Sequence, residues 1–179
     1  MQLCHCKWSA MVLVVILLFG CTSQSAEQVP PPLPNNESIL VQDLDITTGQ
    51  TIYVPAYSEI YFSSGGRTLD LAVTLIIHNT DFSHPIVVTS VRYYDTHGQL
   101  MREYLSQPQR LGPMASTDFF VEPSEQSGGI GTNFIVEWVA EEAVYEPVVE
   151  ALMLHTRGSQ GVSFSSPGRV IKQFEQAGN

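Results

Sequence analysis

Basic residues are scarce in this 179-residue sequence, which has 8 Lys and Arg against 18 Asp and Glu. The only lysines are Lys7 and Lys172, so Schiff-base catalysis by a buried lysine has few candidates. A broad basic groove for nucleic acid is excluded for the same reason, because such binding requires many phosphate contacts.

Cysteine is also rare, with three residues at positions 4, 6 and 21. We expect residues 1–20 to be removed as a signal peptide, so Cys4 and Cys6 leave with it and Cys21 has no intramolecular partner. The mature domain must then fold without a disulfide.

The N-terminus carries an uncharged apolar run, residues 8–20, that follows Lys7 and ends at Cys21. The run is too short to span the ~30 Å hydrocarbon core of a bilayer, which favours a cleaved signal over a membrane helix. An ordinary secretory signal that ends near a cysteine is the alternative.

Leu18-Phe19-Gly20-Cys21 resembles the cleavage motif of bacterial lipoproteins. The resemblance implies that the Cys21 thiol carries diacylglycerol and that the new N-terminus receives another fatty acid, such as palmitate. Several acyl chains would make a stable membrane anchor. Thr22, rather than Asp, follows the cysteine, which by the same resemblance favours the periplasmic face of the outer membrane in a Gram-negative cell envelope.

Loss of residues 1–20 removes Lys7 and no acid, which lowers the formal net charge from −10 by one unit to −11. A charge of this sign repels nucleic acid and anionic lipid headgroups, so the acyl groups must supply the membrane affinity. Charged partners should be cationic, unless the acidic surface serves only solubility.

Residues 21–48 have the composition of a flexible tether, with four prolines between positions 30 and 34. Such a segment has little to bury and should remain extended. Ile39, Leu40, Val41 and Leu44 are the exception, and we expect them to add a short edge strand or to pack against the domain.

The rest of the chain alternates apolar and polar residues with the period of a β-strand, most clearly at Leu69, Leu71, Val73, Leu75 and Ile77. We expect further strands over residues 86–94, 99–105, 116–122, 133–139 and 148–154, and near 162–164. Short strands without crossover helices predict an all-β fold, a single antiparallel β-sandwich over residues 49–172 followed by a polar tail, 173–179. Immunoglobulin-like topology with Trp138 in the core is favoured, and a small barrel is the alternative.

Several long motifs occur in an order that resembles the bacterial envelope family catalogued as domain of unknown function 3124. They are Thr51-Ile-Tyr-Val-Pro-Ala-Tyr-Ser-Glu-Ile-Tyr61, Leu71-Ala-Val-Thr-Leu75, Val88-Thr-Ser-Val-Arg-Tyr-Tyr-Asp95, Arg102-Glu-Tyr-Leu105, Leu111-Gly-Pro113, Asn133-Phe-Ile-Val-Glu-Trp138 and Gly168-Arg-Val-Ile171. The resemblance spans the whole expected domain. It implies no activity and no catalytic residues.

The candidate metal ligands are His78 and Asp81 beside one loop and Asp95 and His97 beside a hairpin turn. Imidazole and carboxylate groups from two loops at one end of a sandwich would suit a divalent metal. The preferred interpretation is that these side chains hydrogen-bond to their own backbone, because Asp and His commonly do so in turns.

Signals for catalysis are weak. Gly161-Val-Ser163-Phe-Ser165 lacks the second glycine and the strand–turn–helix context of a nucleophile elbow. Glu137 and Glu150 would have to meet in one cleft to hydrolyse a glycoside, and acids on a solvated sheet face are the simpler interpretation. The glycines at 128, 129 and 131 precede no Lys-Ser or Lys-Thr pair, so a loop between strands is preferred to a phosphate cradle.

Tyrosines concentrate near the ends of the expected strands, and tyrosine offers a rigid ring with a polar tip for recognition. We interpret Tyr93, Tyr94, Tyr53 and Tyr57 as a candidate binding surface, with burial of their rings under the sheet as the alternative.

Three functions follow from these observations. The leading hypothesis is a non-catalytic, lipid-anchored binding or structural domain that recognises a partner protein or an envelope polymer, without a cofactor and without nucleic acid. The alternative is a carrier of a small ligand or divalent metal, and a hydrolase is the least favoured.

Lipidation of Cys21 is directly testable. We expect the N-terminal peptide of the protein purified from membranes to begin at Cys21 and to carry diacylglycerol and an amide-linked acyl chain, detected by mass spectrometry. Cys21→Ser should release the protein from the membrane fraction. A Cys21 with a free thiol and no lipid would refute the anchor.

Overall fold

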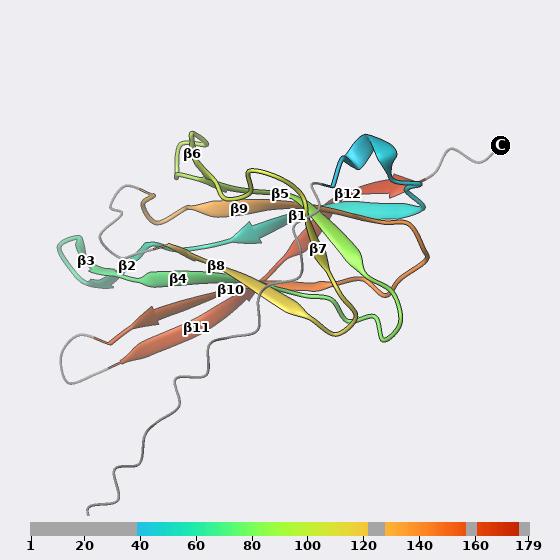
Figure 1. Cartoon of the computed structure of the whole chain (residues 1–179). Coiled ribbons are helices and arrows are strands. Elements are labelled where there is room, and N and C mark those ends of the chain that lie inside the picture. Colours follow the sequence, from blue (N-terminus) through green and yellow to red (C-terminus); the bar gives the residue numbers. More distant parts are fainter. Residues whose placement is uncertain (1–38, 122–127, 157–160, 176–179) are drawn as a thin grey trace, which may run out of the picture. The chain divides into compact units, whose positions relative to one another are not determined.

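The computed structural model describes residues 39–121, 128–156 and 161–175 (Figure 1). Two compact units divide the chain at Asn35 and Asn36, and every described residue belongs to the second unit. The predicted signal peptide, Cys21 and most of the predicted tether lie outside the described residues. Within the described part, no helix is long and apolar enough to cross a membrane.

The described elements are one short 3₁₀ helix and twelve strands. They are η1 (Val41–Asp43), β1 (Thr48–Pro55), β2 (Glu59–Ser63), β3 (Arg67–Asp70), β4 (Ala72–His78), β5 (Ile86–Tyr94), β6 (Leu100–Glu103), β7 (Gln109–Leu111), β8 (Ser116–Val121), β9 (Asn133–Ala140), β10 (Val148–His155), β11 (Val162–Pro167) and β12 (Arg169–Glu175).

The strands form two main sheets and a separate hairpin (Figure 1). One sheet has the order β12-β1-β9-β5-β6, and β7 also pairs with β5; the other has the order β11-β10-β4-β8. Within the described part of the chain, strands β2 and β3 pair only with each other. All these pairs are antiparallel and the sheets do not close on themselves, which confirms the predicted sandwich over the small barrel.

The central pairings are those of an immunoglobulin domain, in which the second strand pairs with the fifth and the third with the sixth. Here β4 pairs with β8, and β5 pairs with β9. The outer strands differ, because β1 lies beside β9 and β10 lies beside β4. Strands β1 and β10, which correspond to the first and last strands of the immunoglobulin order, have therefore exchanged sheets.

The core lies between the two main sheets and is built from alternate residues of the central strands. Val73, Leu75 and Ile77 of β4 are buried against this core, together with Phe134 and Trp138 of β9. Burial of Trp138 confirms its predicted place. The period of two in the sequence thus corresponds to one buried side chain in every second position.

Two local predictions need correction. Residues 39–44 contain the 3₁₀ turn η1 instead of an edge strand. Strand β12 extends to Glu175 and pairs with β1, so residues 173–175 belong to a sheet and not to a polar tail. The polar residues of β12 are accommodated because an edge strand needs only one partner and its exposed residues remain in water.

Burial predicts that replacing two different leucines of the four-stranded sheet by alanine will change the free energy of unfolding by very different amounts. Leu75→Ala removes a fully buried side chain and should lower the free energy of unfolding by about 2–5 kcal/mol. Leu152→Ala changes a side chain that is 39% exposed and should cost less than about 1 kcal/mol. Urea denaturation of both variants measures this, and equal losses would contradict the assignment of inner and outer faces.

Candidate functional site

The four tyrosines do not form one surface. Tyr93 is only 4% exposed, with its ring centroid 4.9 Å from that of Phe134, so its prediction as a surface residue is wrong. Adjacent residues of a strand point to opposite faces, so Tyr94 is half-buried on the outside while Tyr93 enters the core. Tyr53 shares the outer face of the six-stranded sheet with Tyr94, and Tyr57 lies elsewhere, against Phe164.

The predicted metal ligands lie at opposite ends of the sandwich. His78 and Asp81 precede β5, whereas Asp95 and His97 follow it, and nine residues at ~3.3 Å each separate the loops by about 30 Å. No group of three or more potential ligands occurs among the described residues. A metal site on these four residues would require the loops to meet at one end, and their separation contradicts it.

Both aspartates instead hold their own loops, which is the preferred interpretation. Oδ1 of Asp81 accepts hydrogen bonds from the backbone N–H groups of Ser83 and His84, both at 2.8 Å. Oδ1 of Asp95 accepts from the N–H groups of His97 and Gln99, at 2.8 and 2.7 Å. These carboxylates complete turns, and the hydrogen bonds limit their availability to a metal.

The two candidate acids do not share a cleft. Glu137 lies on the outer face of the six-stranded sheet and binds Arg92 at 2.7 Å between Oε1 and Nη2. Glu150 lies opposite Ile76 and Pro167 on the outer face of the other sheet. Since the core separates the two faces, these acids cannot act together on one glycosidic bond.

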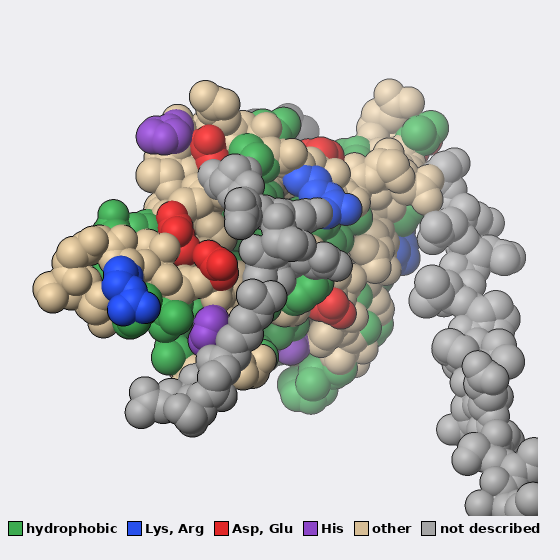
Figure 2. Space-filling view, turned by 90° about the vertical axis from the view of Figure 1, so that its left-hand side faces the viewer, with side chains coloured by type: hydrophobic (Ala, Val, Ile, Leu, Met, Phe, Trp, Pro, Cys, Tyr) green, Lys and Arg blue, Asp and Glu red, His purple; other side chains and the backbone are tan. Residues whose placement is uncertain are grey.

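The serine and glycine candidates have structural roles as well. Ser163 lies opposite Leu154 on an outer strand face, without an imidazole beside it in the described contacts. Thr96 holds the glycine loop, because its Oγ1 donates to the carbonyl of Gly128 at 2.8 Å and accepts from the N–H of Gly131 at 2.9 Å. Figure 2 views an end of the unit where acidic, basic and apolar side chains are interspersed.

The outer face of the four-stranded sheet is the most distinctive surface of the described residues. It exposes large apolar side chains from two strands, at 47% for Phe120, 49% for Val148 and 42% for Leu154, besides Leu152. The register places Leu152 opposite Thr74, and Thr74 opposite Phe120. We call this surface the outer face, comprising Ala72, Thr74, Ile76, His78, Ser116, Asp118, Phe120, Val148, Glu150, Leu152 and Leu154.

The charges of the outer face have one sign. Asp118 and Glu150 lie on either side of Ile76 in one cross-strand row. Strands β4, β8, β10 and β11 contain no Lys or Arg. The six-stranded sheet is different, because the side that it turns away from the core carries basic residues. They are Arg92, Arg110, Arg169 and Lys172, each paired with a residue of that side on the neighbouring strand.

Antiparallel sheets commonly bury one face and present a polar one to water. The outer face departs from that rule because β10 exposes Val148, Leu152 and Leu154, and Phe120 of β8 lies across Thr74 from Leu152. Large apolar side chains exposed on one sheet face mark interaction sites. The arrangement suits association with another apolar surface, and the acids within the face favour Lys or Arg on the partner.

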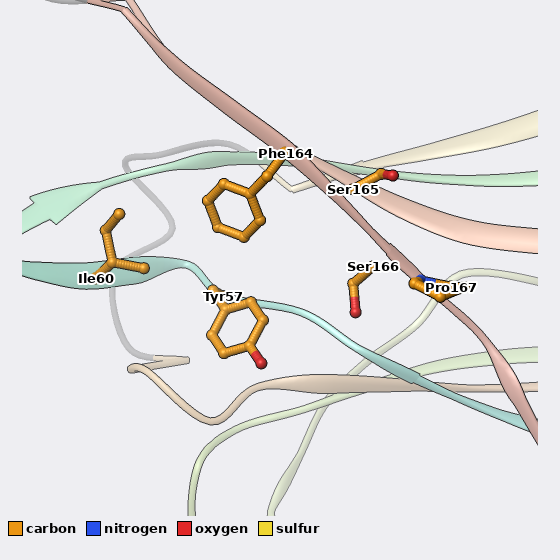
Figure 3. A pocket seen from close by; sticks show the side chains of 6 residues that line it. All are labelled: Tyr57, Ile60, Phe164, Ser165, Ser166 and Pro167. Carbon is orange, nitrogen blue, oxygen red and sulfur yellow. The ribbon is translucent and has the colours of Figure 1, made fainter.

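A shallow depression lies beside β11, between that strand and the segment from β1 to β2. Its volume is about 380 Å³ and its lining consists of Tyr57, Ile60, Phe164, Ser165, Ser166 and Pro167. The ring centroids of Tyr57 and Phe164 are 5.9 Å apart. Figure 3 shows Phe164 and Ser166 directed toward Tyr57, with Ser165 directed away from it.

Sequence reasoning missed the outer face, although a signal was present. Val148, Glu150, Leu152 and Leu154 alternate regularly, but the structure buries the intervening residues Val149, Ala151 and Met153. Both faces of this strand are thus largely apolar. When a strand is apolar at both its odd and its even positions but packs against a second sheet on only one face, the other face is a candidate docking surface.

These features define a β-sandwich domain with one apolar, acidic sheet face. The chain belongs to the family described as "Protein of unknown function (DUF3124)", whose model matches residues 49–171. This confirms the resemblance seen in the sequence motifs.

Comparison with curated proteins found no match. Among solved structures, the "Crystal Structure of Thermotoga maritima 1070" is similar with a TM-score of 0.37 and 11% sequence identity. That similarity covers 73% of this chain and 97% of the other.

The hydrogen bonds to Asp81 predict that the stability of the fold depends on pH. The N–H groups of Ser83 and His84, with smaller contributions from Tyr145 and the His84 imidazole, lower the pKa of Asp81. A lowered pKa stabilises the fold above the unfolded-state value of about 3.9, and the contribution is lost as the pH falls through the folded-state pKa.

Asp81→Asn should therefore be less stable than the wild type at neutral pH, and this difference should shrink as the pH falls below about 4. Denaturant unfolding between pH 7 and pH 3 measures the difference. Asp118→Asn, on an exposed strand position, is the control and should have little effect. A loss for Asp81→Asn that is independent of pH would contradict the assigned role of the carboxylate.

Proposed function

We propose that this protein is a non-catalytic, lipid-anchored binding domain of the bacterial cell envelope that docks a partner protein on the outer face of its four-stranded sheet. The observation that carries the proposal is the exposure of Phe120, Val148, Leu152 and Leu154 around the central strand β4. The partner contributes an apolar surface that carries Lys or Arg opposite Asp118 and Glu150.

The shape of the face favours a protein over a small ligand. Its apolar side chains extend over three adjacent strands, and burial of such an area drives protein association. Phe120 lies on the edge strand β8, where a large ring 47% exposed can act as an anchor. Asp118 and Glu150 steer and orient a cationic partner without determining most of the affinity.

The proposed anchor is Cys21, with residues 22–47 as the tether to the first strand. Acyl chains on Cys21 would hold the domain at the periplasmic face of the outer membrane if the cell is Gram-negative. Confinement to a membrane surface raises the effective concentration of the domain toward partners in the same envelope. A modest intrinsic affinity of the outer face is then sufficient for function.

Photocrosslinking tests the proposal. A photoreactive amino acid at Leu154 in the full-length protein should give a discrete, protease-sensitive adduct in cells that contain the native envelope. The matched control is Ile171, which is 55% exposed on the other sheet and should give little adduct. Glu150→Lys should reduce the Leu154 adduct at least about fivefold, because it reverses one charge on the face.

Two results would contradict the proposal. Equal crosslinking from Leu154 and Ile171 would remove the special role of the outer face. An adduct that resists proteases but is released by a muramidase would identify an envelope polymer in place of a protein. Thermal unfolding of each variant shows whether the domain remains folded.

A further inference from the structure

Among the described strands, β11 has no partner on its outer side, so one edge of the four-stranded sheet is unpaired there. It pairs with β10 through Val162, Phe164 and Ser166, which lie opposite His155, Met153 and Ala151. The carbonyl of Val149 accepts from the N–H of Gly168 at 2.8 Å, so the odd-numbered residues of β10 direct their backbone groups toward β11. Alternation then directs the N–H and C=O groups of Ser163 and Ser165 away from β10.

Nothing among the described contacts occupies these edge groups. Strand β11 pairs only with β10, and no hydrogen bond to another described residue uses the backbone of Ser163 or Ser165. Natural proteins protect such edges with lysine, charges or an interior proline. Strand β11 has none of these before its last residue, Pro167.

The depression lies along the same strand. Phe164 and Ser166 direct their side chains into it, and Tyr57 and Ile60 form the facing wall (Figure 3). A strand placed beside β11 would direct alternate side chains into this depression. Its other side chains would lie beside Ser163 and Ser165 and extend the row that contains Leu152 and Leu154.

The charges near this edge complement a basic segment. Glu150 lies opposite Pro167 at the end of β11, on the same face as Ser163 and Ser165. The four-stranded sheet contributes no Lys or Arg. Lysine or arginine side chains on an added strand would therefore meet Glu150 and no cation of this sheet.

We propose that β11 receives an extended, basic peptide segment of the partner protein as a fifth strand of the sheet, with an apolar side chain of that segment in the Tyr57–Phe164 depression. Backbone hydrogen bonds to Ser163 and Ser165 supply affinity, and the depression supplies specificity. This inference deepens the proposed function, on which it rests for the nature of the partner as a protein. It adds a second binding element, because the segment binds at the edge of the sheet and not on the outer face.

The test uses the full-length protein in detergent and fluorescent heptapeptides of the form Lys-Val-Lys-Phe-Lys-Val-Lys. Fluorescence anisotropy should show saturable binding that a scrambled peptide of equal composition and charge does not share. An edge strand bonds through only every second residue. N-methylation of one alternate set of amides should therefore weaken binding about tenfold or more, and N-methylation of the other set should change it less than about twofold.

A matched pair of protein variants tests the edge itself. Ser165→Pro removes the outward N–H and places a ring at the edge while leaving the bonds to β10 intact, and should weaken binding about tenfold or more. Ser165→Ala keeps the N–H and should bind within about twofold of the wild type. If Ser165→Pro does not fold, the comparison of the N-methylated peptides decides the question alone.

Several outcomes would overturn the inference. They are no saturable binding by the alternating peptides, equal affinity for the scrambled peptide, equal effects of both N-methylated sets, or wild-type affinity in a folded Ser165→Pro variant. Failure here combined with a Leu154 crosslink would leave the outer face as the docking site. Peptide binding at the edge without a Leu154 crosslink would refute docking on the outer face and would support binding at β11.

Discussion

The register of β4 between β8 and β10 is the constraint from which the rest of the structure follows. Val73, Leu75 and Ile77 are fully buried, and this burial determines which residues of the neighbouring strands lie opposite them. A slip by one residue would move every buried side chain to the solvent. The same register therefore places Thr74 and Ile76 at the centre of the outer face, so core formation and the proposed docking surface have one physical cause.

The loops at the ends of the sandwich serve the fold. Asn79 is buried, and its Nδ2 donates to the carbonyls of His84, Leu111 and Gly112, which ties three segments together. Asp81 and Asp95 each bind two backbone N–H groups of their own turns. Polar side chains that resemble ligands in the sequence are thus occupied by backbone groups, as buried polar groups require. Among the described residues, the surfaces that we propose for binding are a sheet face and a strand edge.

Local periodicity predicted much of the fold. The alternation from Leu71 to Ile77 identified β4 and its buried face, although Leu69 belongs to β3, and the turn at residues 95–98 placed the hairpin between β5 and β6. The candidate sites were harder to predict, for two reasons. Tyr93 and Tyr94 are adjacent in sequence but point to opposite sides of β5, and the loops of His78 and His97 are separated by the length of that strand. Proximity along the chain does not determine proximity in space.

The sequence by itself determined the class of the fold, most strands of its core and the family, because period-two burial and ordered motifs are local properties of the chain. Strand β1, which contributes Ile52 and Val54 to the core, was not among the predicted strands. Tertiary structure alone decided which apolar residues remain exposed. Leu152 and Met153 have similar hydrophobicity, but Met153 faces the second sheet and Leu152 faces water. Whether a strand meets a second sheet or another strand at its edge depends on contacts between distant segments, so only the assembled sandwich reveals the outer face and the open edge of β11.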